Sequence, residues 1–534
     1  MTIAELIDKA AAADPTRTAL VAARVRLTRA ELRQRVNRLA VGLHNLGIQK
    51  GDAALLQLPN WSEFVYAYFA LQKIGAVPVL LISGYGREEV SHLCHLVQAT
   101  AWIVPQIYRN RDYTPCITAV REGSSHLRHV ISVRAQRHDQ NFSASLEEIM
   151  ANVADADVEI QTAKCGAQPT DVAHILPSGG TTGLPKAIPR AHQDYLCNVK
   201  FLHEAGEMTA EDVCLIAVPV GHNLALLNVV GAALIGYPIV LLDSTRPEDI
   251  CHAIAAEHVS YLPTVPSLLK RILEFDGINN YDLHSLRKIS AGGEPATPDL
   301  IERVRQKLQC TTISEFGMSE GPLCRTRLGD DLKTACGTVG KPICPQDEFR
   351  ILDDQGQALP PEKDGELAAR GPGIFAGYLN NREENQRAFT ADGFFRTGDL
   401  ARIDEFGNVT ITGRIKDVIN RGGEKISPAQ VEKLLLAHPE IADAAVIGMP
   451  DAALGEKVCA YIRPIVGATP DPQEIRVFMA RVGASKLLIP ERIEMVDALP
   501  LTEAGKHDKK ALREDIKQKL AHNTAAAARS VNRA

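Results

Sequence analysis

The segment Ser178-Gly179-Gly180-Thr181-Thr182-Gly183-Leu184-Pro185-Lys186 has the composition of a loop that binds phosphate oxygens. Its three glycines allow backbone angles at which several amide N–H groups point at one anion. Hydroxyl groups and the Lys186 ammonium add donors and positive charge. A Walker A loop is excluded, because Leu184 and Pro185 separate the last glycine from the lysine. The alternative is a solvated turn rich in Ser and Thr.

A second informative segment lies more than three hundred residues downstream, at Pro500-Leu501-Thr502-Glu503-Ala504-Gly505-Lys506. It places one lysine on a short turn preceded by glycine, which is able to aim a single side chain. Because Lys509 and Lys510 follow, the alternative is an ordinary solvated basic cluster. Taken together, the two segments predict a nucleotide-dependent enzyme whose phosphate loop is completed by a charge from a mobile C-terminal part.

Length and composition restrict the class of protein. The chain has 534 residues, 45% hydrophobic and 23% charged, with a net charge of −6. This length predicts at least two domains. The sequence has no dense basic stripe, so its charge pattern does not indicate nucleic acid as a partner. Eleven cysteines without metal-binding spacing, and an N-terminus without a signal-peptide pattern, predict a reduced cytoplasmic protein. The apolar stretch 224–242 is interpreted as a buried helix and strand, not a membrane span.

Patterns along the chain predict an α/β fold. Thr28 and Glu31 form a capping box at the start of a helix that should end near Gly47. Strand-like 53–58, helix-like 63–74 and strand-like 77–81 then alternate, which is typical of parallel sheets with crossover helices. After about residue 347 the strands become shorter, and a small α+β unit follows, with a helix over 428–437 capped by Ser427. We expect an adenylation domain over 1–415, a mobile domain over 416–521 and a disordered tail over 522–534.

Further motifs follow the phosphate loop in order: Glu315-Phe316-Gly317-Met318-Ser319-Glu320, Phe395-Arg396-Thr397-Gly398-Asp399 and Gly413-Arg414-Ile415-Lys416-Asp417. With Lys506 at the end, the set resembles the motifs of the adenylate-forming superfamily of acyl and aryl acid–AMP ligases. One departure is Pro177, where that family commonly has Thr. The resemblance implies a large N-terminal domain of parallel sheets with flanking helices and a small β-barrel-like part. It also implies a small mobile α+β C-terminal domain.

The resemblance implies roles in binding ATP and Mg²⁺. It assigns the β- and γ-phosphates to Ser178, Gly179, Gly180, Thr181, Thr182, Gly183 and Lys186. It assigns the adenine pocket to Gly293, Glu294, Glu315, Phe316 and Gly317. Ser319 would contact phosphate, and Glu320 would hold Mg²⁺, which prefers oxygen ligands. Considered alone, Glu320 would be interpreted as part of a solvated helix face.

Two more positions would act on the nucleotide. Asp399 suits the ribose diol, because one carboxylate can accept two hydroxyl hydrogen bonds, and Arg414 is expected on the same ribose. Without its neighbours, Asp399 would be interpreted as a turn or a helix cap. Lys506 would bridge the substrate carboxylate and the α-phosphate. Since negative charge builds up at that phosphorus as pyrophosphate leaves, fixed cations are the main catalytic resource.

The resemblance also implies a second reaction in the same cleft. Lys416 would be the hinge about which the small domain rotates, withdrawing Lys506 and presenting another face to a thiol. Gly423 and Lys425, in the turn Arg421-Gly422-Gly423-Glu424-Lys425, would line the thiol tunnel. The alternative for this turn is a simple strand-to-helix connection. The thiol would belong to coenzyme A or to a separate carrier protein.

The acid is indicated by Gly221-His222-Asn223, which follows a strand over 215–218. Relatives that activate 2,3-dihydroxybenzoate or salicylate carry Ala-His-Asn here, and their Asn binds a ring hydroxyl. His222, Asn223 and Asn228 are therefore the expected acid-binding residues, although a loop capping the next helix is the alternative. An aryl or cyclic acid in siderophore or secondary-metabolite biosynthesis is the prediction. Leu224, Asn228 and Glu294-Pro295 depart from those relatives, so the ring pocket is altered.

Two other functions fit parts of the sequence. Glu294-Pro295 is similar to general acyl-CoA ligases, which would act on a non-hydroxylated or aliphatic acid. A nucleotide-binding regulatory protein that has lost its ligase chemistry is a further alternative. Against this last possibility, every charged position expected to act is filled, namely Lys186, Glu320, Asp399, Arg414 and Lys506.

Overall fold

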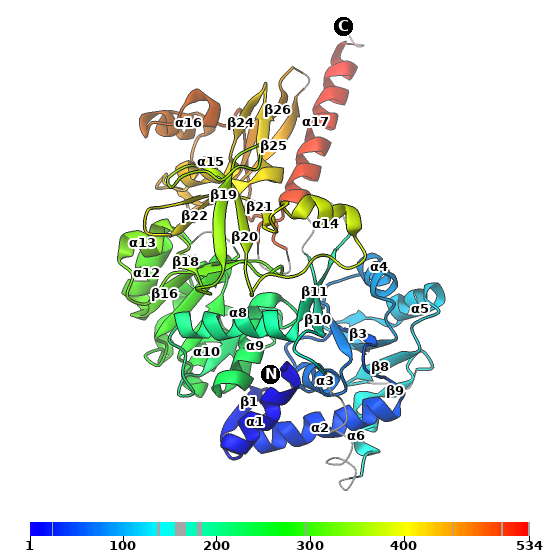
Figure 1. Ribbon diagram of the computed structural model, residues 1–534. Helices are drawn as coiled ribbons and strands as arrows, with labels where there is room; N and C mark the ends of the chain where they lie inside the picture. Colours follow the sequence, from blue (N-terminus) through cyan, green and yellow to red (C-terminus); the bar gives the residue numbers. More distant parts are fainter. Residues whose placement is uncertain are drawn as a thin grey trace. The chain divides into compact units, whose positions relative to one another are not determined.

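The computed structural model describes residues 1–23, 25–135, 139–154, 167–178, 184–293, 296–451, 453–502 and 506–531, with side chains up to residue 520. Internal contacts divide the chain into two compact units (Figure 1). Unit 1 comprises Met1–Phe349 and Ala369–Phe395, and unit 2 comprises Arg350–Ala368 and Arg396–Ala534. Unit 2 thus includes residues 350–368 and 396–415 besides the segment from 416 that we expected to form the smaller domain.

The larger sheet of unit 1 has nine strands in the order β18-β17-β16-β15-β14-β12-β13-β1-β2. Its central strands run parallel, and β2, β17 and β18 are antiparallel to their neighbours. The strands are β1 (Thr18–Ala22), β2 (Val25–Thr28), β12 (Cys214–Ile216), β13 (Ile239–Leu241), β14 (Tyr261–Thr264), β15 (Lys288–Gly292), β16 (Thr311–Gly317), β17 (Leu323–Arg325) and β18 (Lys341–Pro342).

A second sheet of unit 1 has seven strands in the order β11-β10-β4-β3-β5-β8-β9, all parallel except for the β10–β11 hairpin. These strands are β3 (Ala53–Leu56), β4 (Val77–Leu80), β5 (Ala101–Pro105), β8 (His129–Val133), β9 (Ala144–Ser145), β10 (Val172–Pro177) and β11 (Ala187–Ala191). A separate hairpin pairs β6 (Ile107–Tyr108) with β7 (Arg111–Asp112). The two parallel sheets confirm the expected fold class.

Helices connect the parallel strands of unit 1. They are η1 (Ile3–Glu5), α1 (Leu6–Ala13), α2 (Arg29–Asn45), α3 (Ser62–Lys73), α4 (Arg87–Val97), α5 (Thr114–Gly123), α6 (Leu146–Ala151), α8 (His192–Ala205), α9 (Asn223–Ile235), α10 (Pro247–Glu257), α11 (Pro266–Leu273), η4 (Asp276–Asn280), α12 (Pro298–Leu308), α13 (Leu332–Gly337) and α14 (Arg382–Ala388). The predicted capping box is present, since Thr28 Oγ1 accepts from the Glu31 amide and the Glu31 carboxylate accepts from the Thr28 amide.

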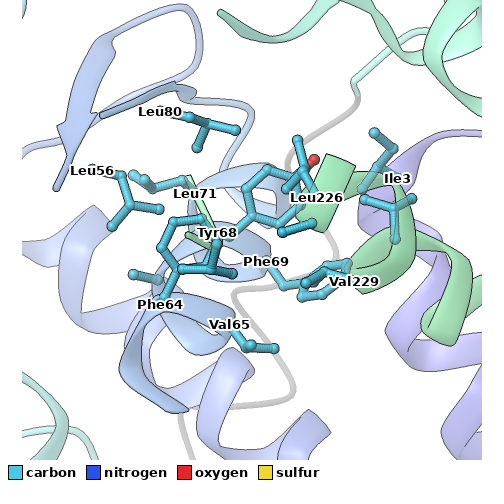
Figure 2. Packing of buried hydrophobic residues seen from close by; sticks show 14 of the residues in the cluster. Ile3, Leu56, Phe64, Val65, Tyr68, Phe69, Leu71, Leu80, Leu226 and Val229 are labelled. Carbon is cyan, nitrogen blue, oxygen red and sulfur yellow. The ribbon is translucent and has the colours of Figure 1, made fainter. Parts of the chain in front are cut away.

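The apolar stretch 224–242 forms α9 and β13, as its pattern predicted. Figure 2 shows Phe64, Tyr68 and Phe69 of α3 packed close to Leu226 and Val229 of α9. All five side chains are at most 1% exposed. Among the helices in the described part of the chain, none combines the length and apolar composition needed to span a bilayer.

Unit 2 contains all but a few terminal residues of a β-sheet, together with an α+β region. The strands β19 (Glu348–Leu352), β20 (Gly365–Arg370), β21 (Phe395–Ile403) and β22 (Val409–Arg414) form a four-stranded sheet in that order. A second sheet combines β23 (Ile419–Arg421), β24 (Glu424–Ile426), β25 (Ile441–Asp451), β26 (Gly455–Pro464) and β27 (Arg492–Met495). The helices are η5 (Ile415–Asp417), α15 (Pro428–Leu435), α16 (Pro472–Arg481), η6 (Lys486–Leu488) and α17 (Lys509–Val531).

Two local expectations for unit 2 differ from the structure. Ser427 precedes α15 as predicted, but its side chain makes no capping hydrogen bond and donates instead to the carbonyl of Thr412, 2.7 Å away. The helix α17 continues through Val531, whereas we expected no regular structure from residue 522 (Figure 1). Four consecutive alanines occur in this segment, and alanine has the highest helix propensity.

Candidate active site

The predicted phosphate loop connects β10 to β11, and its two ends, Ser178 and Lys186, form the neck of the loop. The Ser178 amide donates to the Lys186 carbonyl at 2.8 Å, and the Lys186 amide donates to Ser178 Oγ at 2.9 Å. The hydroxyl hydrogen of Ser178 is therefore available to another acceptor. Gly179, Gly180, Thr181, Thr182 and Gly183 lie outside the described residues. The two ends of the loop are held together by the hairpin itself.

The Lys186 side chain contacts one residue just before α14 and one residue within this helix. Its ammonium forms an ion pair with Glu384 and lies 4.6 Å from the centre of the Tyr378 ring. The backbone confirms this proximity, since the Leu379 amide donates to the Ala187 carbonyl at 3.0 Å. A lysine over an aromatic face is stabilised by the ring quadrupole. The lysine expected to bind phosphate is thus held at the loop neck.

Glu320 is a buried carboxylate in a turn, not part of a solvated helix face. Its side-chain Oε1 accepts from the Tyr378 hydroxyl at 2.9 Å, and its carbonyl accepts from the Phe375 amide at 2.8 Å. Burial raises the pKa of this carboxyl, while the Tyr378 hydroxyl and the Lys186 charge lower it. Because a nearby cation favours the ionised form, the group is suited to a metal ion or another positive partner.

The residues expected near adenine lie at the ends of β15 and β16. Gly293 follows β15 with φ of 90°, while Glu294 and Pro295 lie outside the described residues. At the end of β16, Phe316 is half-buried and Gly317 is exposed, whereas Glu315 forms an ion pair with buried Arg325. Glu315 thus has a structural partner inside unit 1. Ser319 is half-buried and its carbonyl accepts from Arg190.

The expected acid-binding residues lie at the start of α9, beyond the end of β12. His222 is the N-cap, and its Nδ1 accepts from the Leu224 amide at 3.3 Å, so the capping alternative is realised, while acid binding by His222 stays a prediction. Asn223 is 7% exposed, and its Oδ1 accepts from the Tyr195 hydroxyl at 2.9 Å. This bond leaves the Nδ2 donor as the part of the amide that can turn toward a ligand.

Asn228 lies one and a half turns further along α9 and is fully buried. Its Nδ2 donates to the Leu224 carbonyl at 2.8 Å, within the same helix. Its Oδ1 has no hydrogen-bond partner among the described residues. An unpartnered buried acceptor costs about 1–3 kcal/mol, which a donor on a bound molecule would recover.

In unit 2, Asp399 and Arg414 face each other across β21 and β22. They are directly paired in the antiparallel register, and Arg414 Nε donates to Asp399 Oδ1 at 2.8 Å. Asp399 is 2% exposed, and its Oδ2 has no hydrogen-bond partner among the described residues. A buried carboxylate oxygen with free lone pairs fits the hydroxyl donors of a ribose. This orphaned oxygen is the feature of unit 2 that best fits a nucleotide.

The charges expected to act at the hinge and in catalysis are close to Asp399 within unit 2. Burial raises the pKa of Asp399, and the charges of Arg414, Lys416 and Lys506 lower it. Lys416 lies in η5, directly after β22. Thr502 and Lys506 are bonded to each other, since the Thr502 amide donates to the Lys506 carbonyl at 2.7 Å and the Lys506 amide to Thr502 Oγ1 at 3.2 Å. Glu503, Ala504 and Gly505, which the sequence predicts to form a turn, lie outside the described residues.

The segment expected to line the thiol tunnel is a hairpin turn in unit 2. Gly422 and Gly423 connect β23 to β24 with φ of 59° and 96°, the left-handed values that a two-residue turn of this kind requires. Lys425 is exposed and lies 3.4 Å from the Asp354 carboxylate. The alternative of a strand-to-helix turn is wrong, because the turn joins two strands, while the role in the thiol tunnel stays a prediction.

Unit 1 therefore brings together Ser178, Lys186, Ser319 and Glu320, and unit 2 brings together Asp399, Arg414, Lys416 and Lys506. Sequence reasoning missed Tyr378, Glu384 and Arg190, which contact these residues. Tyr378 stands in Gly377-Tyr378-Leu379, where only an isolated tyrosine next to a glycine was visible. Arg190 is a charged residue between apolar residues in a strand, a signal that indicates a buried partner without identifying it.

Comparison with known proteins shows the family. The protein-family model described as "AMP-binding enzyme" matches residues 7–379, and the family model described as "AMP-binding enzyme C-terminal domain" matches residues 430–506. The chain therefore belongs to the AMP-binding enzymes, the adenylate-forming class that its ordered motifs resemble.

Individual relatives agree over most of their length. Triostin synthetase I from Streptomyces triostinicus is 41% identical over 93% of this chain and 91% of its own. The 2,3-dihydroxybenzoate-AMP ligase of Bacillus subtilis is 37% identical over 97% of this chain and 94% of its own. The apo structure of MbtA from Mycobacterium smegmatis is 35% identical, with a TM-score of 0.73, and covers 96% of this chain and 94% of that chain.

Proposed function

We propose that this protein uses ATP to activate an aryl carboxylic acid as an acyl-AMP, and then transfers the acyl group to a pantetheine thiol. The observation that carries the proposal is the group formed by Lys186, Tyr378 and Glu320 beside the neck of the phosphate loop. In this group a cation and a buried carboxylate lie close together, which supports binding of a triphosphate with its metal ion. The family match and the named relatives support the same class of reaction.

The first step forms one bond and breaks one bond. A carboxylate oxygen of the acid attacks the α-phosphorus of ATP, and the bond to the bridging oxygen breaks, so that pyrophosphate leaves with the electron pair. Lys506 is proposed to contact both the attacking carboxylate and the α-phosphate. Ser178 and Lys186 would hold the leaving phosphates. Such fixed donors act mainly by electrostatic stabilisation of the transition state.

Mg²⁺ would neutralise charge on the phosphates, with Glu320 as its protein ligand. Among the described residues, no cluster of three or more His, Cys, Asp or Glu side chains has metal-binding geometry. A single carboxylate fits Mg²⁺, which commonly binds through one or two carboxylates together with substrate phosphates. Asp399 and Arg414 would bind the ribose, because Asp399 keeps one buried oxygen for hydroxyl donors.

The class of acid follows from the start of α9. Asn223 has committed its oxygen to Tyr195, so its Nδ2 would donate to an acceptor on the acid or its ring. The relative from Bacillus subtilis is named for 2,3-dihydroxybenzoate, an aryl acid. Leu224 and Asn228 change the surroundings of Asn223 from those of the dihydroxybenzoate enzymes. An aryl or cyclic acid other than 2,3-dihydroxybenzoate is therefore the proposed substrate.

In the second step, the thiol releases its proton to water and its sulfur attacks the carbonyl carbon of the acyl-AMP. The bond from this carbon to the phosphate oxygen breaks, and AMP leaves with the electron pair as the thioester forms. Lys416 is the proposed hinge for the change between the two steps, and Gly423 and Lys425 would line the path of the thiol. The thiol would belong to coenzyme A or to a separate carrier protein. Supplying each acceptor in turn to the purified protein, with the activated acid, distinguishes them.

Exchange of labelled pyrophosphate into ATP tests the first step. We expect exchange that depends on an aryl or cyclic acid, with at least tenfold higher kcat/KM than for aliphatic acids of similar size. The panel should include benzoates, heteroaromatic carboxylic acids, cyclic acids and fatty acids. Preference for a fatty acid would establish the general acyl-CoA ligase instead. An absence of exchange across the panel would favour a nucleotide-binding protein without ligase chemistry.

A further inference from the structure

Arg190 is a fully buried arginine in β11 whose three nitrogens all donate hydrogen bonds. Its Nε donates to Asp194 Oδ1 at 2.8 Å, and its Nη2 donates to Asn198 Oδ1 at 2.8 Å. Both acceptors lie on α8. The remaining bonds leave this helix, from Nη1 to the Ser319 carbonyl at 2.8 Å and from Nη2 to the Gly373 carbonyl at 2.9 Å.

The two carbonyl acceptors belong to the segments that hold Glu320. Ser319 directly precedes Glu320, and the segment after Gly373 contacts Glu320 twice, through the Phe375 amide and the Tyr378 hydroxyl. These segments are in direct backbone contact. A Cβ atom at Gly321 would lie 2.1 Å from the Gly373 carbonyl oxygen, so nothing larger than glycine fits between them.

The burial of Arg190 requires a reason, because an isolated buried charge is expensive. The Asp194 carboxylate compensates the charge of Arg190, and the Asn198 side-chain oxygen accepts a hydrogen bond from the guanidinium. The rest of the guanidinium spans the gap between the loop at Ser319 and the loop at Gly373. Its planar fork can bond several acceptors in fixed directions, whereas a lysine ammonium has three donors on one atom.

We propose that Arg190 is a positioning residue that fixes the Ser319 and Gly373 carbonyls and thereby holds the Glu320 carboxylate where it can bind a divalent cation. This inference rests on the proposed function, since it uses the metal role assigned to Glu320. Arg190 touches neither nucleotide nor metal in this assignment. Its hydrogen bonds act through the two loops on either side of Glu320, while its charge also lowers the pKa of the Glu320 carboxyl, an effect that Arg190→Lys retains.

The test is the substitution Arg190→Lys in the full chain, with Arg29→Lys as the matched control. Arg29 is 8% exposed, and its Nη2 donates to the Gly236 carbonyl at 2.6 Å, away from the Glu320 segment. Mn²⁺ binding is measured by electron paramagnetic resonance with α,β-methylene-ATP present, and Tm is measured in parallel. We expect at least tenfold weaker Mn²⁺ binding for Arg190→Lys and less than a twofold change for Arg29→Lys.

A second variant, Asn198→Ala, keeps Arg190 but removes one acceptor of its fork. We expect two- to fivefold weaker Mn²⁺ binding with an unchanged KM for the acid, and this variant decides the matter if Arg190→Lys does not fold. Should both variants bind Mn²⁺ as Arg29→Lys does, the positioning role is overturned while the proposed function stands. If the unmodified protein itself binds no Mn²⁺ with the analogue, the metal assignment of Glu320 fails first.

Discussion

Burial controls the chemistry of three carboxyl groups, Glu320, Asp399 and Asp347. In each case removal from water raises the pKa, and nearby donors or cations lower it. Glu320 and Asp399 have proposed ligands, a metal ion and a ribose, whereas Asp347 has none. The Oδ1 atom of Asp347 accepts from the Gly373 amide at 3.3 Å, while its Oδ2 is buried without a hydrogen-bond partner among the described residues.

The buried carboxyl of Asp347 is therefore expected to make the stability of the folded protein depend on pH. Burial raises its pKa from 3.8 to about 6, so the folded protein binds this proton more tightly than the unfolded chain does. The stability that the folded protein gains from this protonated carboxyl is fully present below pH 3.8 and is lost as the pH rises through about 6. Asp347→Asn stays neutral, so its Tm relative to the wild type should rise by about 2 °C between pH 4.5 and 7.5.

The Tm of each protein is measured by thermal unfolding across this pH range. The contribution of Asp347 to the free energy of unfolding changes by about 2 kcal/mol at most over the range. Glu274→Gln, which alters an exposed carboxylate of unit 1, is the control and should show a nearly constant difference from the wild type. A Tm difference for Asp347→Asn that does not vary with pH would contradict the assignment.

At the scale of elements, the site depends on where strands end and how loops cross. The register of β21 and β22 sets Asp399 opposite Arg414, and the β10–β11 hairpin holds Ser178 beside Lys186. A close crossing brings the turn at Gly321 against the segment at Gly373. Gly321 has φ of 118°, a value that favours glycine, besides lacking room for a Cβ atom.

Gly321→Ala is therefore expected to separate the two segments around Glu320. We predict a loss of more than about 3 kcal/mol in stability, or a folded protein whose exchange activity is reduced at least 100-fold. The control is Gly329→Ala, in the next connection along the chain, between β17 and α13, where a Cβ atom would meet nothing within 4 Å. Urea unfolding and pyrophosphate exchange measure both effects. Equal behaviour of the two variants would refute the role of this crossing.

Much of the element order could be predicted from sequence, because it depends on local patterns. Thr28 and Glu31 indicate a helix start through a capping box, and the alternation over 53–81 gives β3, α3 and β4 within one or two residues. The side chain of Ser427 was harder, since the competing acceptor on Thr412 lies in a strand distant in sequence. Its position could be predicted, but its partner could not.

The same distinction applies to the site. Glu320 and Asp399 stand inside recognisable motifs, so the order of residues along the chain is enough to identify them. Tyr378 and Arg190 act by joining segments that lie 58 to 183 residues apart, and no local pattern records such contacts. Sequence therefore identifies residues expected to touch ligand more readily than those that hold them in place.

At the scale of the whole molecule, the proposed catalytic groups are divided between the two units. Unit 1 holds Lys186 and Glu320, and unit 2 holds Asp399, Arg414 and Lys506. Under the proposed mechanism, adenylation needs both sets of residues, whereas thioester formation does not need Lys506. The two half-reactions should therefore depend differently on this lysine.

Separate measurement of the half-reactions of Lys506→Ala tests this central claim most directly. Adenylation is followed by pyrophosphate exchange, and thioester formation by supplying preformed acyl-AMP and a thiol acceptor. The control is Lys510→Ala, an exposed lysine four residues away at the start of α17. We predict at least a 100-fold loss of adenylation for Lys506→Ala, with thioester formation within about threefold of the wild type and Lys510→Ala unchanged in both. An equal loss in the two half-reactions, or undiminished adenylation, would contradict the account.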